Sequence, residues 1–287
     1  MTMHVDNRDS VLVVGSDGSI GRSLVTAFQA SGKNVLQTTR NRNLVSVQKV
    51  FLDLSEDLRQ WPLPTVPVKV AFICAAVTSQ EKCRSEPEYS RRVNVEGTIS
   101  LARRLVDSGC FVIFLSTNVV FDGKKPFAKG NDPVNPQSAY GRQKSEAEAK
   151  LLKMGDMLSI VRFSKVLSPD MPLFQGWIRD LKAGKEICPF SDMLFSPVPL
   201  AFAVEVLLKV AELQIPGIMQ VSAAQEISYA DMAVHIARKL GLDEKLIRPV
   251  SYLESLIERA PLHTTLDVSR LRSELGMIPP EVSKLWS

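Results

Sequence analysis

Short runs of apolar, often β-branched residues alternate with amphipathic stretches through the first 165 residues of this chain. Strand–helix alternation of this kind predicts a mainly parallel sheet covered by helices on both faces, and right-handed crossovers make such a sheet doubly wound. The expected fold is therefore a Rossmann-like α/β fold. The predicted strands are Val11–Val14, Asn34–Thr38, Val47–Phe51, Val68–Cys74, Phe111–Leu115 and Leu158–Phe163, and the predicted helices are Gly21–Ser31, Tyr89–Ser108 and Ala139–Met154.

The pattern changes after Lys165, where prolines and aromatic residues become frequent up to Leu200. We expect a dinucleotide-binding domain over residues 1–165 and a smaller substrate-binding lobe over 166–287 at the sheet's carboxyl edge, with about 198–221 returning to the sheet. The predicted elements here are helices near Phe174–Ala183, at Leu200–Leu213 and at Tyr229–Leu240, the last closed by Gly241, and a strand at Gly217–Val221.

The first predicted strand runs directly into Gly15-x-x-Gly18-x-x-Gly21 and then into a helix. Glycines allow a tight turn and let a pyrophosphate approach the backbone, while the first N–H groups of the helix favour its charge. The strand–turn–helix context predicts nucleotide binding by this loop, including Ser19 and Ile20. A purely structural turn is the alternative, and Asp17 must point away from the phosphates.

The second strand ends in Arg40, where an NAD-selective site usually places an acidic residue on the ribose 2′-hydroxyl. Arg40, helped by Arg42, could instead bind the 2′-phosphate of NADP through its guanidinium group, or it could be a solvated surface arginine. Asp53, followed by Leu54, is either a partner of the adenine amino group or part of a helix cap. NADP is thus the expected cofactor and NAD the alternative.

Tyr140 and Lys144 open the helix Ala139–Met154, and their i, i+4 spacing puts both on one helix face. A nearby ammonium can lower the pKa of a phenol and make it a proton shuttle. Upstream, a buried strand delivers Ser116 and Thr117 to its carboxyl end, where the active sites of such sheets lie. We expect Thr117, with Ser116 as second choice, to bind the reacting oxygen of a substrate.

Composition fits an ordinary globular protein, with 45% hydrophobic and 23% charged residues and a mean hydropathy of +0.03. The net charge of +4 is spread along the chain, so nothing indicates a nucleic-acid-binding arm. No apolar run is long enough to cross a membrane, and residues 1–10 lack a signal peptide's apolar core. We expect a cytoplasmic protein whose four cysteines are reduced and buried, with no metal site.

These residues resemble the extended short-chain dehydrogenase/reductase superfamily, and within it the dTDP-4-dehydrorhamnose reductase branch. The resemblance covers almost the whole chain, closely up to Arg162 and more loosely after it. The segments that carry it are the glycine loop, Cys74-Ala-Ala76…Cys83…Pro87…Asn94-Val-x-Gly97-Thr, Ser116-Thr-Asn-Val-Val-Phe-Asp-Gly123, Asn135-Pro136…Tyr140-Gly-x-x-Lys144-x-x-x-Glu148 and Arg259-Ala-Pro261…Leu266-Asp-x-Ser-Arg-Leu…Leu-Gly276.

The resemblance implies an NAD(P)-dependent oxidoreductase with a catalytic Thr117–Tyr140–Lys144 trio and a nucleotide-activated sugar in the C-terminal lobe. Asn118-Val119 replaces the family's Asp-Tyr, which argues against the dehydratase branch, where an Asp-Glu pair does acid–base work. Beyond the residues named above, we expect Ala75, Ala76, Asn94 and Ser116 to bind cofactor, together with Tyr140 and Lys144, and Thr117, Asn118, Trp177 and Arg259 to contact substrate.

The leading hypothesis is an NADPH-dependent reductase of a keto group on a nucleotide sugar, with Tyr140 as proton donor. One alternative is an epimerase that oxidises and re-reduces a sugar carbon with tightly held NAD. Another is a non-catalytic NADP-binding regulatory protein, of which the regulatory subunit of methionine adenosyltransferase is a relative. Relatives often dimerise through the helices corresponding to Tyr89–Ser108 and Ala139–Met154, so a homodimer is an expectation.

Overall fold

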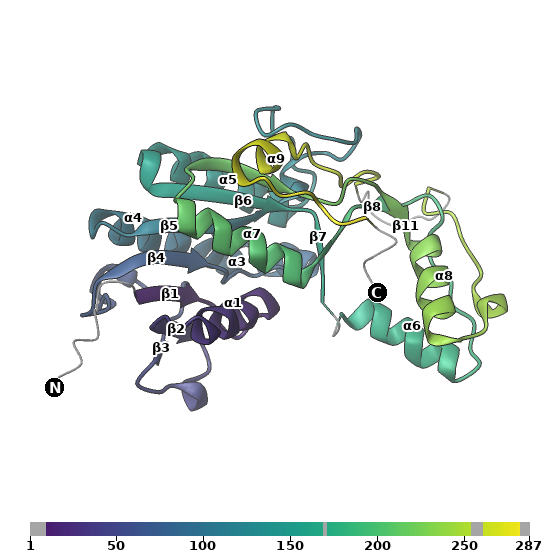
Figure 1. Ribbon diagram of the computed structural model, residues 1–287, viewed down its shortest axis with the longest axis horizontal. Helices are drawn as coiled ribbons and strands as arrows, with labels where there is room; N and C mark the ends of the chain where they lie inside the picture. The colour runs from purple at the N-terminus through teal and green to yellow at the C-terminus, as the bar shows by residue number, and fades with distance from the viewer. Residues whose placement is uncertain (1–9, 169–170, 254–260, 282–287) are drawn as a thin grey trace.

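A parallel seven-stranded sheet forms the centre of the computed structural model, which describes residues 10–168, 171–253 and 261–281 (Figure 1). The strand order is β10-β6-β5-β4-β1-β2-β3, so the direction of winding reverses at β1. This confirms the doubly wound, Rossmann-like fold. The strands are β1 (Ser10–Val14), β2 (Val35–Thr39), β3 (Lys49–Phe51), β4 (Val68–Ile73), β5 (Phe111–Thr117), β6 (Leu158–Phe163) and β10 (Gly217–Val221).

Helices cover both faces of the sheet because its central strands are apolar on both sides. On one face, α1 and α7 pack over a core that includes Leu24, Phe72 and Leu207. On the other face, α4 and α5 pack over a core that includes Leu101, Phe114 and Ala147. The helices around the sheet are α1 (Ser19–Ala30), α2 (Gln80–Ser85), α3 (Pro87–Arg91), α4 (Thr98–Asp107), α5 (Ala139–Leu151), α7 (Leu200–Leu213) and α9 (Ser269–Leu275).

The helix expected at Tyr89–Ser108 is a composite of three pieces. It begins at Pro87, whose fixed φ suits the first position of a helix, and a π-helical turn at Arg92–Gly97 separates α3 from α4. A Cβ at Gly97 would overlap the Leu54 carbonyl oxygen, so this turn lies directly against the loop after β3. Similarly, α5 ends at Leu151 rather than Met154 and continues as a 3₁₀ turn.

A second group of elements lies to one side of the sheet (Figure 1). Its apolar residues form two small clusters, one around Phe174 and Phe195 and one around Leu181 and Ala237. The group comprises α6 (Pro172–Lys182), α8 (Tyr229–Leu240), β8 (Leu194–Phe195) and β11 (Ile227–Ser228), and β7 (Lys165–Leu167) pairs with β9 (Pro197–Pro199) where the chain enters and leaves it. Ser228 caps α8, and Gly241 ends it in the left-handed conformation that its sequence predicts.

The strand β10 returns to the edge of the main sheet, where helix α9 and the segments at Ala128 and Asp267 lie against it. The Arg270 guanidinium donates to the carbonyl oxygens of Ile218 (2.8 Å) and Pro216 (2.7 Å). The Gln220 amide donates to those of Ala128 (2.9 Å) and Asp267 (3.0 Å). Arg270 thereby occupies a backbone acceptor of this edge strand, and the Gln220 side chain ties the strand to the two segments that lie against it.

Three of the sequence expectations concern the chain as a whole. Within the described residues, no helix is long and apolar enough to cross a membrane, and no three His, Cys, Asp or Glu side chains gather as a metal site. All four cysteines are free thiols. Cys83 and Cys110 are buried as expected and Cys74 is half-buried, but Cys188 is exposed, because it lies in the loop-rich part of the lobe and not in the sheet.

Candidate active site

The glycine loop joins β1 to α1, and its three glycines meet different neighbours. Gly15 has φ +82°, and a Cβ there would lie 2.7 Å from the Ala75 nitrogen. A Cβ at Gly21 would overlap the Gly15 carbonyl oxygen. Gly18 forms the N-cap of α1 and is exposed, and a Cβ there would lie 3.7 Å from the Gly15 carbonyl oxygen, an ordinary van der Waals distance. The fold itself therefore requires glycine at 15 and 21, whereas Gly18 leaves the start of α1 open to an approaching group.

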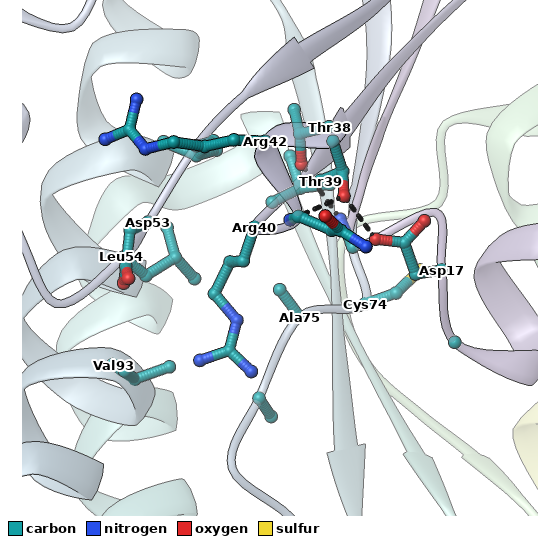
Figure 2. Close-up of a pocket in the computed structure, with 16 residues that line it drawn as sticks. Asp17, Thr38, Thr39, Arg40, Arg42, Asp53, Leu54, Cys74, Ala75 and Val93 are labelled. Atoms are coloured by element: carbon teal, nitrogen blue, oxygen red, sulfur yellow. Dashed lines mark hydrogen bonds between the residues drawn. The ribbon is translucent and has the colours of Figure 1, made fainter. Parts of the chain in front are cut away.

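A cavity of about 720 Å³ opens beside this loop, where the ends of β1, β2, β3 and β4 meet (Figure 2). It lies at the point where the strand order reverses, which is the usual ligand site of such sheets. Seven residues expected to bind cofactor line it: Gly15, Gly18, Arg40, Asp53, Leu54, Ala75 and Ala76. Arg42, expected to help Arg40, lines it as well. The sequence did not indicate the other lining residues Val14, Thr38, Thr39, Asn41, Leu52, Cys74 and Val93.

The two arginines after β2 behave differently. The Arg40 side chain extends into the cavity toward Val93 and donates to the Tyr89 hydroxyl at 2.5 Å (Figure 2). Arg42 lies instead over the Phe51 ring, with 3.9 Å from the guanidinium carbon to the ring centroid. Asp53 accepts from the backbone nitrogen and the hydroxyl of Ser55, both at 2.8 Å, so its carboxylate caps the turn after β3 while lining the cavity.

Asp17 also lines the cavity, and its carboxylate is directed toward the end of β2 (Figure 2). One oxygen accepts from the Thr39 hydroxyl at 2.5 Å, and the other pairs with the Lys49 ammonium at 2.7 Å. Burial raises the pKa of Asp17, but the hydrogen bonds from Lys49 and Thr39 outweigh it and hold the pKa below its usual value. Asp17 is therefore an ion-paired carboxylate at one rim of the cavity.

Tyr140 and Lys144 lie in the first turns of α5, where Ser138 accepts from the Gly141 nitrogen as the N-cap. A Cβ at Gly141 would overlap the Val119 carbonyl oxygen, so only glycine lets α5 pack this closely on the turn that follows β5. The Lys144 side chain, 1% exposed, donates to the Leu115 carbonyl oxygen at 2.5 Å and lies 3.7 Å from the Phe114 ring centroid. Lys144 therefore reaches the end of β5, two residues from Thr117.

Burial is the main cause of the pKa shifts of both Tyr140 and Lys144. It raises the pKa of Tyr140, and the neighbouring Cys83 adds to that shift. It lowers the pKa of Lys144 to about 7, although Glu148 and Cys74 oppose the change. The Lys144 ammonium contacts the Leu115 carbonyl oxygen and the Phe114 ring rather than the phenol. In this structure Tyr140 is a protonated phenol at neutral pH, with a proton available to donate.

Asn94 and Ser116, expected at the cofactor, are both buried. The Asn94 amide accepts from the Val77 nitrogen (2.8 Å) and donates to the Val77 carbonyl (2.9 Å) and the Gln143 side chain (2.8 Å), so it fixes the loop after β4 against α5. Among the described atoms, the Ser116 hydroxyl has no hydrogen-bond partner. Thr117 accepts from the Val119 nitrogen at 3.3 Å, and Asn118 follows it in a half-buried 3₁₀ turn.

Of the two remaining substrate candidates, only Trp177 is described, and it lies in the second group of elements. Trp177 packs against the rings of Phe174 and Tyr229, at centroid distances of 5.3 and 6.3 Å, as part of the lobe's apolar clusters. Arg259 lies outside the described residues. A hollow of about 20 Å³ marks the place where the lobe meets the start of α5, and it is lined by Gln80, Val119, Phe121, Asp122, Gln137, Ser138 and Pro261.

A doubly wound sheet, a glycine loop at its switch point and a Tyr-x-x-x-Lys helix beside β5 define an extended short-chain dehydrogenase/reductase. A family model described as the RmlD substrate binding domain matches residues 9–284. The chain belongs to this family, which confirms the resemblance drawn from the sequence.

Two curated relatives extend the comparison. Methionine adenosyltransferase 2 subunit beta of Bos taurus is 24% identical over 289 residues, covering 94% of this chain and 84% of the relative. A Haloferax volcanii protein named "Probable low-salt glycan biosynthesis reductase" is 26% identical over 281 residues, covering 93% of each. The chain is therefore similar both to a protein named as a subunit of methionine adenosyltransferase and to a protein named as a reductase.

Solved structures share the fold over nearly the whole chain. A dTDP-4-dehydrorhamnose reductase from Clostridium acetobutylicum superposes with a TM-score of 0.83 at 25% identity, covering 96% of each chain. One from Bacillus anthracis, in complex with NADP, has a TM-score of 0.83 at 20% identity and covers 96% of this chain and 94% of its own.

Proposed function

We propose that this protein is an NADPH-dependent reductase of a keto group on a nucleotide-activated sugar. The observation that carries the proposal is the position of Lys144 near the carboxyl end of β5, on the carbonyl of Leu115 two residues before Thr117, and one helical turn from Tyr140. Cys74 connects this group to the glycine-loop cavity, because it lines the cavity and directly follows Ile73, which pairs with Phe114 of β5 beside the Lys144 contact at Leu115.

The cavity fits the adenosine and pyrophosphate parts of a dinucleotide. Its size suits a ligand of that class, and the open α1 N-terminus at Gly18 offers backbone N–H groups to phosphate. Arg40 offers a guanidinium that can bind a 2′-phosphate, which supports NADP, as does the NADP in the Bacillus anthracis reductase. When bound, the dinucleotide would supply or accept hydride at its nicotinamide ring.

The chain's own residues would handle the substrate oxygen and its proton. Tyr140, a neutral phenol, would donate its proton to the oxygen as the carbonyl is reduced. The Thr117 hydroxyl accepts one hydrogen bond from Val119 and can still donate one, which suits it to orient that oxygen. Lys144 has three ammonium protons, of which Leu115 takes one, so it can also bind a ribose hydroxyl and stabilise a phenolate.

The sugar would enter from the side of the second lobe, toward the small hollow between Gln137, Phe121 and Pro261. Residues 1–165 would bind the cofactor, and residues 166–287 would form the substrate-binding lobe. Asn118 would lie nearest the sugar, and Trp177 would shape the lobe from its apolar core. Asn118-Val119 offers no carboxylate after Thr117, which favours simple reduction over dehydration.

The proposed homodimer would pair α4 and α5 with a second copy, and light scattering would measure its mass.

The test is NADPH oxidation with a panel of nucleotide-linked keto sugars. Tyr140→Phe should lower kcat by about 10²- to 10⁴-fold, the usual contribution of a positioned acid, while the Kd for NADPH is retained. Tyr229→Phe is the matched control, because that ring packs in the lobe and its loss of a hydroxyl should leave kcat unchanged. Full turnover by Tyr140→Phe would contradict the proposal.

A second candidate is a non-catalytic NADP-binding regulator, and the similarity to methionine adenosyltransferase 2 subunit beta favours it. The two functions separate in a deletion strain complemented with Tyr140→Phe. A reductase requires the phenol, so complementation should fail. Complementation by a variant that still binds NADPH would establish the regulatory function.

A further inference from the structure

Three side chains from separate parts of the chain meet at one rim of the cavity. Asp17 belongs to the glycine loop, Thr39 ends β2, and Lys49 begins β3. The parallel pairing of β3 with β2, in which Lys49 lies opposite Gln37, brings the lysine to this edge. Asp17 uses one carboxylate oxygen for the Thr39 hydroxyl and the other for the Lys49 ammonium.

The charges at this rim decide whether the cavity favours a ribose with a free 2′-hydroxyl or one with a 2′-phosphate. A carboxylate at the end of β2 would accept a hydrogen bond from a ribose 2′-hydroxyl and would repel a 2′-phosphate. Asp17 puts such a carboxylate there from the glycine loop, although β2 itself ends in Arg40. Lys49 neutralises it, and the pair is only partly open to solvent, with the side chains of Lys49 and Asp17 exposed by 20% and 40%.

Three other charged side chains lie near Asp17, and each makes contacts of its own. Arg42 lies over Phe51 and Asp53 is held by Ser55. Arg22 donates to the backbone oxygen of Asp17 at 2.6 Å, and its charge adds to the effect of Lys49 on the pKa of the Asp17 carboxyl, which Lys49 lowers more strongly. With Asp17 paired to Lys49, Arg40 supplies a positive charge that projects into the cavity, while Arg42 lines the cavity with its guanidinium over the Phe51 ring.

We infer that Lys49 is a specificity-determining residue: by pairing with Asp17 it removes the carboxylate that would select against a 2′-phosphate, and so permits Arg40 to bind one. The inference rests on the proposed binding of a dinucleotide in this cavity. Lys49 acts here as a positioning residue, through Asp17, and not as a direct ligand of the phosphate.

Calorimetric titration with ADP-ribose and 2′-phospho-ADP-ribose tests the inference without turnover, because both probes lack the nicotinamide. The measured quantity is the ratio of the two dissociation constants, for the intact chain and for Lys49→Met, Asp17→Asn and the double variant. Lys209→Met is the matched control, since it breaks a lysine–carboxylate pair with Glu212 (2.9 Å) on α7. Thermal unfolding of each variant verifies that it is folded.

Lys49→Met should reduce the preference for the 2′-phosphate by about tenfold, the scale of one uncompensated charge at a partly exposed site. Asp17→Asn should keep the preference, and adding it to Lys49→Met should restore the preference, while Lys209→Met should change nothing. An unchanged ratio in Lys49→Met would overturn the inference and leave dinucleotide binding intact. A double variant as impaired as Lys49→Met would also overturn it, because Lys49 would then act on the phosphate directly. If the intact chain bound neither probe, the cofactor proposal itself would fail.

Discussion

The three glycines of the loop between β1 and α1 are needed for different physical reasons. Gly15 adopts a positive φ and lies against Ala75, and Gly21 packs on the Gly15 carbonyl, so both are required by the fold. Gly18 has open space around its Cα and an ordinary φ of −75°. The sequence motif treats the three alike, but only Gly18 is not required by the fold itself.

Alanine substitutions should separate a glycine that the fold requires from one that ligand binding requires. Gly21→Ala should lower the free energy of unfolding by about 1–3 kcal/mol, because its Cβ must displace backbone. Gly18→Ala should cost less than about 1 kcal/mol, the scale of an N-cap change, yet weaken NADPH binding, because its Cβ would face the pyrophosphate. Chemical denaturation and calorimetric titration measure the two effects. Equal losses of stability in both variants would contradict this assignment.

Lys144 makes stability depend on pH in a defined window. Its folded pKa of about 7 lies below the ordinary value of 10.5, so between these values the unfolded chain binds more protons than the folded one. Stability from this group therefore rises as pH increases from about 7 to 10.5, and below pH 7 its desolvation cost is constant. Lys144→Met should be more stable than the parent near pH 7, with the difference shrinking toward pH 10. Denaturation midpoints measured across this range should converge; parallel pH profiles would disprove the buried-ammonium account.

At the scale of elements, the sequence predicted best where local chemistry defines both ends. The helix Tyr229–Leu240 matches because Ser228 caps its start and Gly241 its end, and both signals are local. The π turn at Arg92–Gly97 has no such signal. It arises where the buried Asn94 bonds Val77 and Gln143 and where Gly97 contacts the loop after β3, contacts that hydrophobic periodicity does not encode.

A buried ion pair joins α5 to β6 and should contribute strongly. Glu148 and Arg162, both with side chains 3% exposed, approach to 2.7 Å, and Arg162 also donates to the Gly130 carbonyl. Glu148→Gln should lower the free energy of unfolding by about 3–5 kcal/mol, because it leaves the Arg162 charge buried without its partner. The exposed pair Lys209–Glu212 supplies the control, since Glu212→Gln should cost about 0–1 kcal/mol. Similar costs for the two variants, measured by urea denaturation, would refute the distinction.

For the whole molecule, the cavity at the switch point links ligand binding to global stability. Its lining comes from the ends of four strands and from the π turn, so a ligand there binds only the folded sheet. At a free concentration of about 100 times its Kd, NADPH should raise the free energy of unfolding by about 2.7 kcal/mol. Scanning calorimetry at several NADPH concentrations should show the unfolding temperature rising steadily. A concentration-independent unfolding temperature would indicate that the cavity does not bind the cofactor.

The sequence by itself determined the strand–helix order, the glycine loop, the Tyr140–Lys144 helix and hence the family, because periodicity, caps and motif spacing are properties of neighbouring residues. Only the tertiary structure decided where the charges act. It paired Asp17 with Lys49, turned Arg42 onto Phe51, and fixed Lys144 on Leu115 instead of the phenol. These outcomes depend on strand pairing and burial between segments distant in the chain, and no local pattern specifies which of several nearby charges will meet.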